Sequence, residues 1–290
     1  MKKIGFIGLG NMGSKMVINL LNANHEVIGF DINEKLVDQL VSKGLKKASN
    51  LNEITNDIDI IITMLPNGEI VKKVYDDIIN KLKPNTLVTD CSTIDVNTAI
   101  KLHEMCKAKN ILSLDAPVSG GVGGAENGTL TFMVGGNETA YKLMLPLFEA
   151  MGKKSVLCGQ SSSGQAAKAC NNMLLAITMI GVGEAFNLGS NLGLNPEKLF
   201  EILSTSTSSC WAINTYCPIQ GIGPKSPADN NFEPGFSANL MLKDLTIALE
   251  AIEETKSSAP FGKKAQQNYK RMINDNKGDL DFSAITTFNK

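Results

Sequence analysis

The sequence has few of the residues from which metal sites and disulfide frameworks are built. Only two of its 290 residues are histidine, His25 and His103, and its six cysteines are scattered without a Cys-x-x-Cys pair. A structural or catalytic metal site needs several such ligands close together, so we expect no metal site. Scattered cysteines favour reduced thiols in a reducing compartment over a disulfide framework.

Neither histidine stands where a catalytic one would be expected. His25 precedes a predicted strand and His103 lies inside a predicted helix. In a parallel sheet, ligands bind beyond the carboxyl ends of the strands. A proton relay through histidine therefore has no candidate.

The sequence also lacks an excess of either charge. Its 28 lysines and arginines balance 29 aspartates and glutamates, and no block of like charge occurs. Binding to nucleic acid or to an anionic membrane depends on basic excess, so we expect neither partner.

Targeting and membrane-spanning segments are not predicted either. The longest apolar stretch, residues 173–183, is shorter than the roughly 20 residues that cross a bilayer. The first predicted strand begins within three residues of Met1, which leaves no room for a targeting segment. We expect a cytoplasmic protein, or one of the mitochondrial matrix if a transit peptide has been removed.

What the sequence does have is a glycine turn near its start. Gly8, Gly10 and Gly13 fit G-x-G-x-x-G between a predicted strand (3–8) and a predicted helix (15–24), with Asn11 and Met12 inside the motif. The first glycine allows the tight turn, the second lets a pyrophosphate approach the backbone, and the third lets helix pack on strand. We expect the phosphates of a dinucleotide at the helix N-terminus. The alternative is a glycine turn that only shapes a loop.

A second dinucleotide signal is Asp31, which ends the next predicted strand. It follows Gly13 by 18 positions, close to the roughly 20 expected for a carboxylate that binds the adenosine ribose. A carboxylate here would repel a 2′-phosphate, and no arginine follows it, so we expect NAD rather than NADP as the cofactor. The alternative is that Asp31 only caps the following helix, which Asn33 could do itself.

Residues 1–162 alternate short apolar runs with amphipathic stretches. This alternation predicts a parallel, doubly wound sheet of Rossmann type. Strands are predicted over residues 3–8, 26–30, 58–64, 86–90, 111–115, 131–135 and 155–158, with helices over 33–43, 68–81, 95–107 and 138–151.

From residue 163 onward the pattern is helical. Residues 165–192 lack proline and are apolar almost all round, which predicts one long, largely buried helix connecting two domains. Further helices are predicted over 195–204, 235–255 and 260–275, and a Gly/Pro-rich loop over 218–236. The predicted fold class is α/β: a dinucleotide-binding domain of residues 1–162, then an all-α domain of residues 163–290 for substrate binding and oligomerisation. One small domain would not cover the long helix, so we expect a homodimer or homotetramer.

Loops beyond predicted strands offer candidate cofactor contacts. Leu65 and Pro66 follow one strand and Thr93 follows the next, where a doubly wound sheet binds its ligand. Lys243, on a later apolar helix, could reach the cofactor. Plain loop structure and a solvated helix face are the respective alternatives.

Two further groups suit an acidic substrate. Ser119, Gly120 and Gly121 offer a hydroxyl and unobstructed N–H groups for a carboxylate, unless they form only a flexible turn. Lys168 and Asn172, four residues apart, share one face of an apolar helix. Burial disfavours the charged form of a lysine, which suits a group that takes a proton from an alcohol. The alternative is a lysine that reaches solvent at a helix end.

These blocks resemble those of the β-hydroxyacid dehydrogenases over nearly the whole chain. Besides the glycine turn, the matching segments are 115–121 (DAPVSGG), 130–136 (LTFMVGG) and 164–172 (GQAAKACNN). The resemblance implies that Lys168 is the general acid/base, that Asn172 orients the substrate, and that the 119–121 turn binds the substrate carboxylate. It also implies cofactor contacts at Leu65, Pro66, Thr93 and Lys243, with Asp31 selecting NAD.

Further segments around Trp211, 215–218 and 240–244 are similar to those of family members that oxidise 3-hydroxyisobutyrate. Trp211 lines the substrate pocket in this interpretation, with a packing role as the alternative. The chain departs from such members at Ile70, where they often have asparagine, so no cofactor contact is assigned there.

The resemblance therefore implies NAD-dependent oxidation of a small β-hydroxyacid, 3-hydroxyisobutyrate, to methylmalonate semialdehyde in valine breakdown. One alternative is reduction of tartronate semialdehyde, glyoxylate or succinate semialdehyde. Another is a catalytically inactive, dehydrogenase-like scaffold, which the presence of Lys168 disfavours.

Overall fold

The computed structural model describes residues 2–288, and the chain divides into two compact units after Lys168. The predicted boundary after residue 162 lies six residues before this division. The first turn of the long helix therefore belongs to the first unit, and the rest of that helix to the second.

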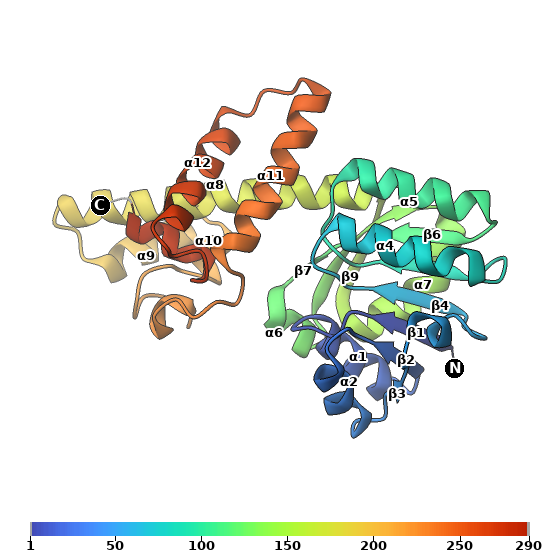
Figure 1. Ribbon diagram of the computed structural model, residues 1–290. Helices are drawn as coiled ribbons and strands as arrows, with labels where there is room; N and C mark the ends of the chain where they lie inside the picture. Colours follow the sequence, from blue (N-terminus) through green and yellow to red (C-terminus); the bar gives the residue numbers. More distant parts are fainter. Residues whose placement is uncertain (1, 289–290) are drawn as a thin grey trace. The chain divides into compact units, whose positions relative to one another are not determined.

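A nine-stranded sheet forms the first unit (Figure 1). Its order is β3-β2-β1-β4-β5-β6-β8-β7, with β9 beside β8. The strands are β1 (Lys3–Ile7), β2 (Glu26–Phe30), β3 (Lys46–Lys47), β4 (Ile60–Thr63), β5 (Leu87–Asp90), β6 (Leu112–Asp115), β7 (Val118–Ser119), β8 (Leu130–Gly136) and β9 (Gly152–Gly159).

The strands from β3 to β6 are parallel and follow the 3-2-1-4-5-6 order of a doubly wound dinucleotide-binding sheet. The predicted α/β class is confirmed. Beyond β6 the sheet is mixed, because β8 runs antiparallel to β6 and β7 and parallel to β9. The two-residue strands β3 and β7 were not predicted, since two residues are too few to carry a hydrophobic period.

Helices cover both faces of this sheet. On one face lie α1 (Gly13–Asn22), α2 (Glu34–Val41), α6 (Gly121–Glu126) and α7 (Glu138–Met151); on the other lie α3 (Leu51–Ile54), α4 (Gly68–Ile78), η1 (Ile79–Lys81) and α5 (Val96–Ala108) (Figure 1). Most begin where an Asn or Asp side chain accepts a backbone N–H of the first turn, at Asn33, Asn50, Asn67, Asp95 and Asn137. Such capping satisfies amides that lack a helical partner.

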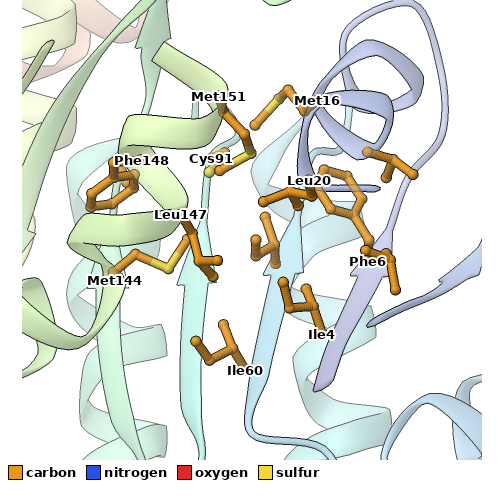
Figure 2. Close-up of a cluster of buried hydrophobic side chains, with 14 of the residues drawn as sticks. Ile4, Phe6, Met16, Leu20, Ile60, Cys91, Met144, Leu147, Phe148 and Met151 are labelled. Carbon is orange, nitrogen blue, oxygen red and sulfur yellow. The ribbon is translucent and has the colours of Figure 1, made fainter. Parts of the chain in front are cut away.

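Alternation along the strands divides the core into two layers. In β4, Ile60 and Ile62 belong to one layer and Ile61 to the other, because successive side chains point to opposite faces. Figure 2 shows part of one layer, in which Ile4 and Ile60 of the sheet meet side chains of α1 and α7, among them Met16, Leu20, Met144, Leu147 and Met151. Strands covered on both faces account for the continuous apolar runs of the sequence.

The second unit is helical, as predicted. It contains most of α8 (Ser163–Asn191), followed by α9 (Pro196–Thr205), α10 (Trp211–Asn214), η2 (Pro227–Asn230), α11 (Ala238–Thr255), α12 (Pro260–Asn274) and η3 (Phe282–Phe288). Its core joins Met179 and Phe186 of α8 to Met241 of α11 and to Tyr269 and Met272 of α12.

Helix α8 is less buried than the sequence predicted. It has 29 residues, and its most apolar 18-residue window is 39% buried. By length and composition it could cross a membrane, so the expectation that this segment is too short was wrong. We interpret it as a core helix with one uncovered face, because Met179 and Phe186 lie in the core whereas Leu174 and Leu188 are each 60% exposed.

Two carboxylates end adjacent strands of the sheet. Asp90 of β5 and Asp115 of β6 are register partners, and each is 2% exposed. Asp90 Oδ1 accepts hydrogen bonds from Thr63 Oγ1 (2.7 Å) and Ser92 Oγ (2.6 Å), whereas its Oδ2 has no partner among the described residues. Burial is the largest influence on this carboxyl and raises its pKa to about 6.

This raised pKa predicts a pH-dependent loss of stability. The folded pKa of Asp90 exceeds its ordinary value of 3.8, so the folded chain binds this proton more tightly than the unfolded chain. Ionisation therefore destabilises the fold as pH rises from about 4 through 6. Asp90→Asn cannot ionise, so it should not lose this stability. The difference in unfolding free energy between Asp90→Asn and the native chain should therefore increase in favour of the variant, by up to roughly 1 kcal/mol per pH unit in that window.

The measurement is urea denaturation of both proteins between about pH 4 and pH 8. Asp77→Asn, at an exposed carboxylate of α4, is the matched control and should show no such gain. A difference between Asp90→Asn and the native chain that does not vary with pH would contradict the prediction.

Candidate active site

In the glycine turn between β1 and α1, two glycines are sterically required, whereas Gly10 has room for a side chain. Gly8 has φ +96°, and a Cβ there would clash with the Met64 carbonyl oxygen. A Cβ at Gly13 would clash with the carbonyl oxygen of Gly8. Gly10 is exposed, and a Cβ there would meet no atom within 4 Å. An open approach to the backbone at Gly10 is what a pyrophosphate needs.

The start of α1 fits an anionic ligand. Its N-cap is Met12, and no side chain of the described residues caps it, in contrast to α2 and α4. Asn11 is exposed and Met12 half-buried within the turn. Backbone amides at a helix start without a side-chain cap favour phosphate, so the turn can hold the pyrophosphate of a dinucleotide.

Asp31 supports the glycine turn from the end of β2. Its Oδ2 accepts the Leu9 N–H (2.7 Å) and its Oδ1 the Asn33 N–H (2.8 Å). Each carboxylate oxygen can accept a further hydrogen bond, so ribose hydroxyls can still bind. The alternative role as a helix cap does not fit, because Asn33 itself caps α2.

The loops after β4 and β5 are tied together below the surface. The Leu65 N–H donates to Ser92 Oγ (2.8 Å), which in turn donates to the buried Asp90. Leu65 and Thr93 are half-buried and Pro66 is exposed. No role was predicted for Ser92, whose hydroxyl joins the loop after β4 to the loop after β5. The cofactor contacts of these two loops remain a prediction.

The 119–121 turn is ordered. Ser119 belongs to β7 and pairs with Thr131 of β8. Gly120 and Gly121 have φ of +132° and +62°, conformations that side chains disfavour. Ser119 is half-buried and both glycines are exposed, so hydroxyl and backbone are accessible to a carboxylate.

Lys168 is buried beside this turn. It is 8% exposed, and its Nζ donates to the carbonyl oxygen of Val118 (2.8 Å), the residue before Ser119. A lysine that merely reaches solvent would not be so enclosed. The structure thus places a buried amine next to a candidate carboxylate-binding turn within the first unit.

In the second unit, Asn172 and Lys243 meet at Asp244. Asn172 is 2% exposed, and its Nδ2 donates to Oδ2 of the buried Asp244. The ammonium of Lys243 lies 3.5 Å from Asp244 Oδ1, an oxygen that accepts no hydrogen bond from the described residues. Asp244 thus contacts two predicted site residues, and it was not itself predicted as a site residue from the sequence.

Trp211 begins α10 and is 47% exposed. Its ring stacks on Tyr216, with centroids 4.7 Å apart, and Tyr216 stacks on Phe282. The Tyr216 hydroxyl donates to Oδ2 of the buried Asp281 (2.9 Å). Trp211 therefore presents an exposed ring on a rigid stack, which is compatible with both a pocket wall and a packing role.

Several buried polar residues of the first unit had no predicted role, and Figure 1 locates the elements that carry them. Asp115 ends β6, Gln165 lies in the first turn of α8, and His103 Nε2 of α5 lies 3.0 Å from Asp115 Oδ1. Asp115 and Gln165 lie inside the quoted sequence blocks, but nothing in the sequence shows that they face each other. No group of three or more metal-ligating side chains occurs in residues 2–288.

Comparison with known proteins places this geometry in a family. Residues 3–159 match the family described as the NAD-binding domain of 6-phosphogluconate dehydrogenase. Residues 162–288 match the family described as NAD-binding of NADP-dependent 3-hydroxyisobutyrate dehydrogenase.

Similar proteins cover nearly the whole chain. The solved structure of Mycobacterium tuberculosis 3-hydroxyisobutyrate dehydrogenase with L-serine is 43% identical, with TM-score 0.96 over 100% of this chain and 99% of that one. The mitochondrial 3-hydroxyisobutyrate dehydrogenase of Drosophila melanogaster is 43% identical over 98% of this chain and 88% of its own. An NAD-dependent L-serine dehydrogenase of Pseudomonas aeruginosa is 42% identical over 98% and 97%.

These matches agree with the open glycine turn and with the acid that ends β2. The chain therefore belongs to the 3-hydroxyisobutyrate dehydrogenase family of NAD-dependent oxidoreductases.

Proposed function

We propose that this enzyme oxidises 3-hydroxyisobutyrate to methylmalonate semialdehyde, as in valine breakdown. The observation that carries the proposal is the buried Lys168 amine bonded to Val118, directly before the Ser119 turn. The similar proteins from M. tuberculosis and D. melanogaster are named 3-hydroxyisobutyrate dehydrogenases, which supports the same substrate.

Each residue of the site then has a chemical task. The Ser119 hydroxyl and the exposed backbone at Gly120 and Gly121 bind the substrate carboxylate. Asn172, one helical turn after Lys168, orients the substrate hydroxyl. NAD, bound at the glycine turn, supplies the acceptor for the hydride that leaves the carbinol carbon.

Lys168 moves the proton. A neutral amine donates one N–H to the Val118 carbonyl, as observed, and keeps a lone pair that takes the hydroxyl proton as hydride leaves. In the reverse reaction the ammonium returns that proton to the oxygen. General acid–base action of this kind typically contributes about 10² to 10⁴-fold.

L-Serine is the second candidate substrate. It carries the same carboxylate and primary hydroxyl as 3-hydroxyisobutyrate, with an ammonium group in place of the methyl group. The similar P. aeruginosa protein is named for this activity, and the M. tuberculosis structure contains L-serine. Reduction of tartronate semialdehyde, glyoxylate or succinate semialdehyde has no such support.

A cytoplasmic or mitochondrial-matrix location is part of the proposal, since the D. melanogaster relative is named mitochondrial.

The first prediction concerns substrate and cofactor. Initial rates should show the highest kcat/KM for 3-hydroxyisobutyrate with NAD, above L-serine with NAD and above the three semialdehyde or oxoacid alternatives with NADH. NAD should exceed NADP by at least about tenfold, because the Asp31 carboxylate repels a 2′-phosphate. Asp31→Asn, which removes the charge at nearly constant shape, should narrow the NAD preference. A preference for NADP would contradict the predicted cofactor, and turnover of L-serine alone would contradict the predicted substrate.

The second prediction concerns Lys168. Lys168→Ala should lower kcat by about 10² to 10⁴-fold and leave NAD affinity nearly unchanged, since the amine binds no cofactor phosphate in this proposal. Lys101→Ala, at an exposed lysine of α5, is the matched control and should keep full activity. Steady-state kinetics with NAD titration measure both. Undiminished kcat in Lys168→Ala would exclude the proposed proton transfer.

We also propose that the enzyme is at least a dimer that uses an apolar face of the second unit. Leu174 and Leu188 of α8 are 60% exposed, and further large apolar side chains of this unit are exposed at Leu192 (70%), Leu194 (52%), Ile202 (60%) and Phe261 (73%). Helix α9 has no buried residue at all, although its sequence is amphipathic. Association between chains would remove such exposed apolar side chains from water.

Light scattering after gel filtration should therefore give about two or four times the chain mass of 31.1 kDa. Leu188→Asp should shift the protein toward the monomer, because a buried unpaired charge opposes association. The control Leu143→Asp alters an exposed leucine of the first unit and should leave the mass unchanged. A monomer peak for the native chain would overturn this proposal.

A further inference from the structure

Three separate sequence blocks converge on one buried carboxylate, that of Asp115. Asp115 begins the 115–121 block, and a Cβ added at Gly135 or at Gly164 would clash with its carboxylate oxygens. Gly135 belongs to the 130–136 block, and Gly164 to the block that contains Lys168. The two glycines therefore leave the space that this carboxylate occupies.

The Asp115 carboxylate, at the end of β6, caps the N-terminus of helix α8. Asp115 Oδ1 accepts the Ser162 N–H (2.7 Å), and Oδ2 accepts the Gln165 N–H (2.9 Å). Both amides belong to the start of α8, where helical partners are missing. A negative charge at a helix N-terminus is favourable, and more so when buried. Ser162 has φ +72°, so the chain enters the helix through a disfavoured conformation that the carboxylate holds.

His103 and Ser113 also hold the carboxylate of Asp115 in place. His103 Nε2 lies 3.0 Å from Asp115 Oδ1, and its Nδ1 lies 2.6 Å from Ser113 Oγ. Donation from Nε2 to the carboxylate leaves Nδ1 to accept the Ser113 hydroxyl proton. Helix α5 is thereby connected to the start of α8 through Asp115.

Gln165 ties the same helical turn to the loop after β5. Its Nε2 donates to the Ser92 carbonyl oxygen (2.7 Å), and its Oε1 accepts the Ile94 N–H (3.1 Å). These two residues flank Thr93, a predicted cofactor contact. The first turn of α8 is thus hydrogen-bonded to the ends of both β5 and β6.

Lys168 lies three residues after Gln165, and its Nζ bonds to Val118, three residues after Asp115. The cap therefore joins the helix that carries the amine to the segment that carries the Ser119 turn. We propose that Asp115 is a positioning residue, which sets the Lys168 amine at its working distance from the Ser119 turn by anchoring α8. This inference rests on the proposed role of Lys168.

Asp115→Asn is the primary test. The amide retains nearly the same shape but removes the charge, and its Nδ2 cannot accept an N–H. We expect kcat to fall about 10²-fold through misplacement of the amine, with little change in NAD affinity. Asn137→Ala, which removes the side-chain cap of α7 in the same unit, is the matched control. It should lower the melting temperature but leave kcat unchanged.

A double-mutant cycle separates positioning from general structural damage. If Asp115 acts through Lys168, Asp115→Asn should have no further effect on the residual turnover of Lys168→Ala. Equal losses in both backgrounds would overturn the inference, as would a folded Asp115→Asn with normal kcat. Full activity of Lys168→Ala would instead refute the proposed function, so the two failures are distinguishable.

His103→Leu covers the case in which Asp115→Asn does not fold. It removes the hydrogen bond from His103 to Asp115, but the Asp115 carboxylate can still accept the N–H groups of Ser162 and Gln165. We expect a smaller loss of kcat, about tenfold, that again disappears in the Lys168→Ala background. Unchanged kcat in folded His103→Leu, with Asp115→Asn unable to fold, would reject positioning in favour of a purely structural role.

Discussion

Parallel pairing of the strands from β3 to β6 is the constraint on which the first unit depends. Parallel strands need crossover connections, and the crossover helices cover both faces of the sheet. The strands must then be apolar on both sides, as the triple isoleucine of β4 is. The same pairing collects the carboxyl ends of all these strands at one edge, where Gly8, Asp31, Leu65, Thr93 and Ser119 stand. The candidate site residues gather there because only the loops are free of the packing requirement.

Buried ionisable side chains also lie near that edge of the sheet. Asp90, Asp115 and Lys168 are each at most 8% exposed, and a buried charge is costly unless hydrogen bonds compensate it. Asp115 is compensated on both oxygens, by amides of α8 and by His103. Asp90 is compensated on one oxygen only, and burial raises its pKa to about 6. Two aspartates in neighbouring register positions thus have different sets of hydrogen-bond partners.

Most of the fold was accessible from the sequence because its signals are local. The seven longer strands and the main helices were predicted to within a few residues, since hydrophobic periods and a capping residue such as Asn33 act over one or two turns. The cofactor preference was accessible for the same reason: a glycine turn and an acid at the end of the next strand lie close in sequence. The two-residue strands and the contacts of Asp244 were not accessible, because each depends on segments far apart in the chain.

His103 shows where the local argument stops. Its position on a helix excluded it from the strand ends, yet its ring reaches the carboxylate at the end of β6. The sequence by itself determined the alternation of strands and helices and the glycines that a turn requires, and it singled out Asp31 and Lys168 as candidate site residues. Only the tertiary structure decided that Asp115, Gly135 and Gly164 meet, and that a carboxylate caps the helix of Lys168. The reason is physical: periodicity and turn chemistry are properties of neighbouring residues, whereas burial and hydrogen bonding between distant segments exist only once the chain is packed.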